Sequence, residues 1–249
     1  MTASYQFERQ QLGPLECGIV SPVDRDKPIR SLAVLCHGFG AGGDDLVGLA
    51  SEILQVAPNE EASMMVFPAA PLSLDDEGMP GGRAWWMFSI QKLMSAIEDG
   101  RYEQIRDSVP PGIDDARKKL VATIQAAMEL AGVDEQRLLL GGFSQGAMLS
   151  VDTAVRGLEK PPAALSLLSG CLICEKHWKE NASRLSDCDI FQSHGSLDPV
   201  LPLTTGKWLK DLLVDSGCTV DYLEFTGVHT IPMGAIEKTA AMFAKLNKN

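Results

Sequence analysis

The sequence predicts an α/β protein built on a mostly parallel, doubly wound sheet with helices on both faces. Short apolar runs rich in Val, Leu and Ile alternate along the chain with longer segments of helical spacing. Strands that are apolar on both faces and separated by helices favour parallel pairing under two helical layers. The 249 residues are 45% hydrophobic and contain no repeat or Pro/Ser-rich linker, so we expect one domain over residues 1–249.

The elements are expected in a simple order. Residues 5–11 and 15–20 have no helix between them, which predicts an antiparallel hairpin at the sheet edge. Strands are expected at residues 32–36, 64–67, 137–140, 163–168, 189–192 and 220–225. Helices are expected at residues 44–56, 114–130, 145–155, 204–214 and 234–246. Asp44 and Asp114 are interpreted as N-caps and dipole partners of their helices.

Residues 72–112 fit this alternation least well. A structureless loop of that length is uncommon in a compact domain, so we expect short helices near residues 85–97 and 102–107. We interpret the whole segment as a lid or insert.

The composition excludes several classes of function. The chain has 22 basic and 33 acidic residues, a formal charge of −11, and no basic run, which argues against nucleic acid as a partner. The longest uncharged stretches, residues 138–151 and 161–174, are too short to span a membrane, so no integral membrane association is expected. The first residues lack the features of a secretory signal, which predicts a cytoplasmic location, and the six cysteines are expected to be buried and reduced. A monomer and a homodimer both remain open.

One motif points to chemistry. A predicted apolar strand is followed by Gly142-Phe143-Ser144-Gln145-Gly146 and then by an apolar helix. Gly-x-Ser-x-Gly between a strand and a helix is the nucleophile elbow, a turn so tight that larger side chains beside the serine would collide. Ser144 is therefore the candidate nucleophile, and an ordinary glycine-rich turn is the alternative.

A serine hydroxyl needs a base, and that base needs an orienting acid. In hydrolases with this elbow, the acid and then the histidine follow the serine in the chain. Asp198 and His229 fit this order, and each follows a predicted strand, at the sheet edge where ligands bind. His37 and His194 precede glycines at strand ends and are interpreted as hydrogen-bonded turn residues, whereas His177 lies in a polar segment and is interpreted as a surface residue.

Two backbone amides are expected to form an oxyanion hole, from Gln145 after the nucleophile and from Phe39 in the loop after the first parallel strand. That loop also matches Gly-x-Gly-x-x-Gly at Gly38, Gly40 and Gly43, the dinucleotide fingerprint. The next strand has no acidic residue near its end to hold a ribose, so dinucleotide binding is disfavoured.

With these motifs assembled, the chain resembles the phospholipase/carboxylesterase family of α/β-hydrolases, which includes the acyl-protein thioesterases and small bacterial carboxylesterases. The matching segments are His-Gly-Phe-Gly at 37–40, Phe-Pro-Ala-Ala-Pro at 67–71, Gly-Phe-Ser-Gln-Gly-Ala at 142–147 and His-Gly-Ser-Leu-Asp-Pro-Val at 194–200. The His229 loop follows the last of these, and the resemblance spans roughly residues 31–246.

The resemblance implies an α/β-hydrolase fold, a triad of Ser144, Asp198 and His229, and hydrolysis of an ester or thioester through an acyl-enzyme, without metal or organic cofactor. Arg83-Ala84-Trp85-Trp86 resembles the family's tryptophan-containing segment near the acyl pocket. The candidate substrate-binding residues are Phe39, Trp85, Trp86 and Met87. An ester with a short or medium acyl chain is the expected substrate.

Alternatives remain within and outside this class. The segment from 72 to 112 and the Gly-Gly-Asp stretch after 37–40 differ from the thioesterase pattern, and we expect substrate choice to depend on the former. An acyl-protein thioesterase and a lysophospholipase are the alternatives within the enzyme class. A non-catalytic binding protein on the same fold is the alternative of a different class, and its usual sign, a missing triad residue, is not found here.

Overall fold

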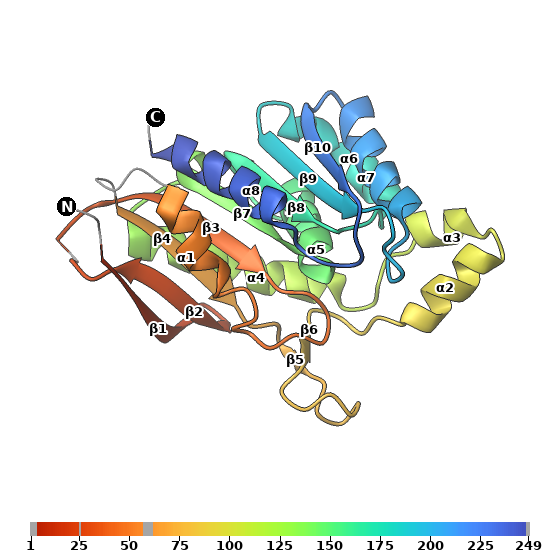
Figure 1. The fold of residues 1–249 in the computed structure, drawn as a ribbon, viewed down its shortest axis with the longest axis horizontal. Coiled ribbons are helices and arrows are strands. Elements are labelled where there is room, and N and C mark those ends of the chain that lie inside the picture. The colour runs from red at the N-terminus through yellow and green to blue at the C-terminus, as the bar shows by residue number, and fades with distance from the viewer. Residues whose placement is uncertain (1–3, 25, 57–61, 248–249) are drawn as a thin grey trace.

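The computed structural model describes residues 4–24, 26–56 and 62–247. Its main sheet has the strand order β1-β2-β4-β3-β7-β8-β9-β10 (Figure 1). The strands are β1 (Tyr5–Leu12), β2 (Leu15–Pro22), β3 (Ile29–Cys36), β4 (Ala62–Pro68), β7 (Leu138–Phe143), β8 (Ala164–Leu168), β9 (Asp189–Gly195) and β10 (Val220–Phe225). From β4 to β10 the neighbours pair in parallel, while β1, β2 and β4 pair antiparallel. The predicted fold class and edge hairpin are confirmed.

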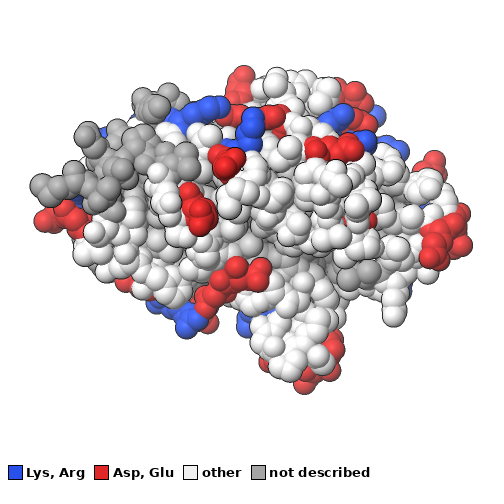
Figure 2. Space-filling view, viewed as in Figure 1, with Lys and Arg blue, Asp and Glu red and all other residues white. Residues whose placement is uncertain are grey.

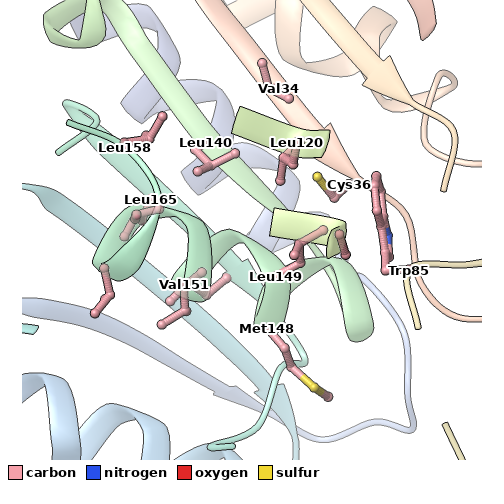
Figure 3. Close-up of a cluster of buried hydrophobic side chains, with 14 of the residues drawn as sticks. Val34, Cys36, Trp85, Leu120, Leu140, Met148, Leu149, Val151, Leu158 and Leu165 are labelled. Atoms are coloured by element: carbon pink, nitrogen blue, oxygen red, sulfur yellow. The ribbon is translucent and has the colours of Figure 1, made fainter. Parts of the chain in front are cut away.

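Helices cover both faces of this sheet (Figure 1). The helices are α1 (Leu49–Val56), α4 (Ile113–Ala131), α5 (Gln145–Arg156), α6 (Glu175–Asn181), α7 (Leu203–Asp215) and α8 (Met233–Leu246). Successive residues of β3 point to opposite sides: Leu32 and Val34 pack in a cluster with α4 to α7, part of which Figure 3 shows, whereas Ala33 and Leu35 pack with α1 and α8. This period of two explains why the strands are apolar at nearly every position.

The structure corrects the predicted start of α1 and both predicted N-caps. Helix α1 begins at Leu49 rather than at residue 44, because residues 44–48 form successive tight turns. Asp44 is therefore not an N-cap and instead pairs with Arg9.

Asp114 lies in the first turn of α4, where its charge complements the helix dipole, but Gly112 occupies the cap position. Helix α6, a polar helix in which Trp178 is the buried residue, was not predicted.

The segment 72–112 divides into two parts. Strands β5 (Leu72–Ser73) and β6 (Arg83–Ala84) pair at the base of a loop that projects from the body, and helices α2 (Ile90–Glu98) and α3 (Tyr102–Arg106) form a hairpin elsewhere on the surface (Figure 1). The short helices expected here are confirmed. Acidic side chains occupy the tip of the projecting loop, where residues 75–77 are exposed (Figure 2).

Two further expectations concern the chemistry of the whole chain. All six cysteines are buried and unpaired. Within the described residues, no helix combines the length and the apolar character that crossing a bilayer requires.

Candidate active site

The turn from β7 into α5 places Ser144 at the carboxyl edge of the sheet. Its backbone has φ 55° and ψ −116°, a strained conformation of the kind that clusters at functional sites. A Cβ on Gly142 would lie 2.4 Å from the carbonyl oxygen of Cys36, and one on Gly146 would lie 2.1 Å from the same oxygen. Only glycine fits at both positions because β3 approaches so closely, which confirms the predicted reason for the motif.

The loops after β9 and β10 bring Asp198 and His229 together. His229 Nδ1 lies 2.6 Å from Asp198 Oδ2, and Asp198 Oδ1 accepts the backbone N–H groups of Val200 and Leu201, each at 2.8 Å. Burial alone would raise the pKa of the Asp198 carboxyl, but the hydrogen bonds from His229, Leu201 and Val200 outweigh it and lower the pKa below its ordinary value. Asp198 is therefore an anion at neutral pH, and its contact leaves His229 Nε2 for a second partner.

Ser144 and His229 line one pocket of about 190 Å³. Among the described residues no hydrogen bond joins Ser144 Oγ to the imidazole. Phe39 and Gln145 line the same pocket. Neither backbone N–H group donates to another described residue, and that of Gln145, at the start of α5, has no partner within the helix.

Hydrogen bonds of His37 fix the loop that carries Phe39. The N–H of Ala70 donates to His37 Nε2 at 3.0 Å, so the ring proton is on Nδ1, which donates to the carbonyl of Gly38 at 2.8 Å. Burial lowers the pKa of His37 and keeps the ring neutral. Trp85 Nε1 donates to the carbonyl of His37 at 2.9 Å. The prediction that His37 shapes a turn is confirmed.

His194 plays a similar part beneath Asp198. Its Nε2 donates to the carbonyl of Leu201 at 2.7 Å and lies 3.6 Å from Asp198 Oδ2. Burial lowers the pKa of this histidine as well. His194 thus fixes the turn whose amides hold the Asp198 carboxylate, as predicted for a turn-shaping residue. His177, which was expected at the surface, lies half-buried on α6.

Two side chains that support the site were not singled out from the sequence. The Gln145 carboxamide accepts the N–H of Trp85 at 3.0 Å and donates to the carbonyl of Trp86 at 2.8 Å. Arg83 exchanges backbone hydrogen bonds with the Phe39 loop, and its Nε donates to the carbonyl of Ala70. Both tie the end of β6 to the site, through contacts that local patterns do not encode.

Comparison with known proteins assigns the family. A family model described as Phospholipase/Carboxylesterase matches residues 18–247. The chain belongs to the phospholipase/carboxylesterase family. It is 30% identical over 183 residues to acyl-protein thioesterase 1 of Eremothecium gossypii, covering 72% of this chain and 70% of that protein. It is 28% identical over 193 residues to acyl-protein thioesterase 1 of Kluyveromyces lactis, covering 77% and 79%.

Solved structures share the α/β-hydrolase fold of this family. Esterase PE8 superimposes with a TM-score of 0.70 at 22% identity, covering 99% of this chain and 100% of PE8. The carboxylesterase of Bacillus cereus superimposes with a TM-score of 0.64 at 17% identity, covering 98% and 95%.

The residues expected to bind substrate in this phospholipase/carboxylesterase family member lie in three different places. Phe39 lines the pocket of Ser144. Trp86 and Met87 line a neighbouring cavity of about 850 Å³. Trp85 is buried, packs its ring against His37 with centroids 5.6 Å apart, and is among the lining residues of neither cavity. It supports the Phe39 loop instead.

Five further residues line the Ser144 pocket and were not predicted to do so: Gly38, Phe88, Phe143, Met148 and Val200. Met148 could have been found, because it lies four residues after Ser144 and hence on the same helical face. Within the described residues, no group of three or more His, Cys, Asp or Glu side chains is placed to hold a metal ion.

Proposed function

We propose that this chain is a serine hydrolase that cleaves carboxylic esters with short to medium acyl chains through an acyl-enzyme. The observation that carries the proposal is the His229–Asp198 hydrogen bond of 2.6 Å beside a pocket that Ser144 shares with His229. Membership of the phospholipase/carboxylesterase family supports the same reaction class.

In the first half of the reaction, Ser144 Oγ attacks the acyl carbonyl while His229 Nε2 accepts the hydroxyl proton. Asp198 keeps the ring oriented and stabilises the imidazolium that forms. The oxyanion accepts the free N–H groups of Phe39 and Gln145, and one such donor is worth about 3 kcal/mol of transition-state stabilisation. Collapse of the intermediate breaks the bond to the leaving group, which takes the proton from His229.

In the second half, water attacks the acyl-enzyme and gives a proton to His229. The second tetrahedral intermediate collapses, the acid leaves, and the proton returns to Ser144 Oγ. Every proton in this cycle passes through His229 Nε2, the ring nitrogen that Asp198 does not occupy.

A thioester substrate is the second candidate, because the relatives named above are called acyl-protein thioesterase 1. The same residues would act, with a thiolate in place of an alkoxide as leaving group. A lysophospholipid is a further candidate, although the charge of −11 weighs against a lipid held in an anionic membrane.

The test is a comparison of kcat/KM across p-nitrophenyl esters from acetate to dodecanoate, an acyl thioester and a lysophospholipid. We expect the esters to be hydrolysed, and Ser144→Ala to lower kcat/KM by about 10⁴-fold or more. Ser51→Ala, an exposed serine on α1, is the matched control and should behave as wild type. A folded wild-type protein that turns over none of these substrates would favour the non-catalytic alternative.

A further inference from the structure

His229 lies in a stretch of the chain with few attachments. Residues 226–232 connect β10 to α8 without forming a helix or strand, and residues 228–231 are half-buried or exposed. In the part of the chain that the structure describes, residues 228–231 make no backbone–backbone hydrogen bond. Asp198 orients the imidazole of His229 but does not contact the backbone of this stretch. Since a base must stay within hydrogen-bond reach of its serine, the backbone needs a contact of its own.

Ser169 makes such a contact. Its hydroxyl donates to the carbonyl of Thr230, the residue after His229, at 3.3 Å. Ser169 directly follows β8, which lies in the sheet between β7 and β9, the strands that lead to the nucleophile and to the acid. Its own N–H donates to the carbonyl of Ser193 in β9 at 2.9 Å, and the residue is fully buried. The hydroxyl therefore reaches the histidine stretch from a fixed point in the sheet.

The residue before Ser169 contacts the nucleophile turn. The carbonyl of Leu168, the last residue of β8, accepts the backbone N–H of Ser144 at 2.8 Å. Two consecutive residues at the end of β8 thus bind the backbone of the serine turn and the backbone of the histidine stretch. This end of the strand links the positions of the nucleophile and the base.

The backbone of Ser169 is strained. Its φ is 50°, in the left-handed region that costs glycine little and disfavours residues with a side chain. Over the residues that the structure describes, Ser144 and Cys174 are the other non-glycine residues with a positive φ. Such strain persists where the surrounding structure enforces it, and it clusters at functional sites. Because glycine would fit here without strain, the serine indicates a use for its hydroxyl.

We propose that Ser169 is a positioning residue for the general base. Its hydroxyl holds the carbonyl of Thr230, which keeps His229 Nε2 within reach of Ser144 Oγ. Ser169 does not line the pocket of Ser144, so it acts through His229 rather than on the substrate. This inference rests on the proposed function, since it assumes that His229 takes the proton of Ser144. Loss of the hydroxyl should lower kcat and leave KM nearly unchanged, because substrate binding does not depend on the base.

Two substitutions remove the hydroxyl but differ in strain. Ser169→Ala keeps a Cβ at a positive φ, whereas Ser169→Gly relieves the strain. In both variants we expect kcat for p-nitrophenyl acetate to fall about tenfold or more, with KM within about twofold of wild type, because a displaced base slows the chemical step. The urea midpoint of Ser169→Gly should equal or exceed that of Ser169→Ala, so the shared loss of kcat would not follow stability.

Ser166→Ala is the matched control. Ser166 is a fully buried serine of β8 whose hydroxyl is hydrogen-bonded to Thr239 Oγ1 of α8 at 2.7 Å, away from the histidine stretch. This variant should lower the urea midpoint and keep kcat within about twofold of wild type. The rate constant for inactivation by a small, neutral fluorophosphonate gives a second readout. It depends on the attack by Ser144 and should fall with kcat in both Ser169 variants.

The outcomes separate this inference from the proposed function. A kcat of Ser169→Gly within about twofold of that of an active wild type would overturn the positioning role and leave the proposed function standing. A rise in KM in place of the fall in kcat, or an equal loss of kcat in Ser166→Ala, would also overturn the positioning role. A folded wild-type protein that hydrolyses no ester and does not react with the fluorophosphonate would overturn both.

Discussion

Gln145 combines two tasks that lie on different parts of the same residue. Its backbone N–H is one of the two free donors in the pocket, and its side chain holds the backbone of Trp85 and Trp86. A long carboxamide beside the nucleophile thus connects α5 to the segment after β6. The contact fixes one wall of the site relative to the serine.

Gln145→Ala should separate these two tasks, because it keeps the backbone amide and removes the side-chain hydrogen bonds to Trp85 and Trp86. It leaves a buried N–H and a buried carbonyl without partners, so the free energy of unfolding should fall by about 2 kcal/mol or more. We also expect a lower kcat for ester hydrolysis. Urea denaturation and steady-state kinetics measure the two effects, with Gln136→Ala, an exposed glutamine, as control. Unchanged stability would contradict the role given to this side chain.

At the residue scale, much of the site was predictable from sequence. Ser144, Asp198 and His229 follow three strand ends, and a parallel sheet must bring such ends to one edge. Trp85 was misplaced because a tryptophan beside a site can support it from within the core as well as line it. Met148 and Phe88 were missed because their shared position depends on how α2 packs over α5.

Three helices meet at a buried carboxylate, that of Asp152 on α5. It accepts hydrogen bonds from Arg117 of α4 at 2.7 Å, from Arg156 of its own helix at 3.0 Å, and from Trp178 Nε1 of α6 at 2.8 Å. The Asp152 side chain is 0% exposed. A buried charge is tolerated only with such a full set of partners.

Asp152→Ala should therefore destabilise the protein strongly, by about 3 kcal/mol or more, because the arginines and the indole N–H lose a shared partner. The midpoint of urea denaturation measures this loss. Asp115→Ala removes a carboxylate that is 80% exposed and should shift the free energy of unfolding by less than about 0.5 kcal/mol. Equal effects of the two variants would show that the hydrogen bonds of Asp152 do not contribute to the free energy of unfolding.

At the element scale, strands and long helices were predicted where the apolar pattern was continuous. The start of α1 was set too early because the turns at residues 44–48 resemble a first helical turn in sequence. Helix α6 was not predicted because its burial depends on one tryptophan, Trp178, which donates a hydrogen bond to Asp152. This contact joins segments that are distant in the sequence.

Two buried histidines make the stability of the whole molecule depend on pH. His37 and His194 are kept neutral because burial lowers the pKa of each below 6.5. Below that pH the unfolded chain binds protons that the folded chain does not, so stability falls as the pH falls. Asp198 acts in the same direction at lower pH, because its pKa lies below 3.8 in the folded protein.

We therefore expect the free energy of unfolding to decrease between about pH 7.5 and about pH 5.5. Urea denaturation at several pH values measures this slope. His194→Gln keeps an amide that can donate to Leu201 but does not titrate, so it should flatten the slope, whereas His177→Gln on α6 provides the control. A stability that rises toward acid would contradict the assignment of neutral, buried rings.

The central claim is that Ser144 is the nucleophile, and fluorophosphonate labelling followed by peptide mapping tests it most directly. The account predicts a stoichiometric adduct on Ser144 in the wild-type protein and none in Ser144→Ala. An adduct on another residue, or equal labelling of Ser144→Ala, would contradict it.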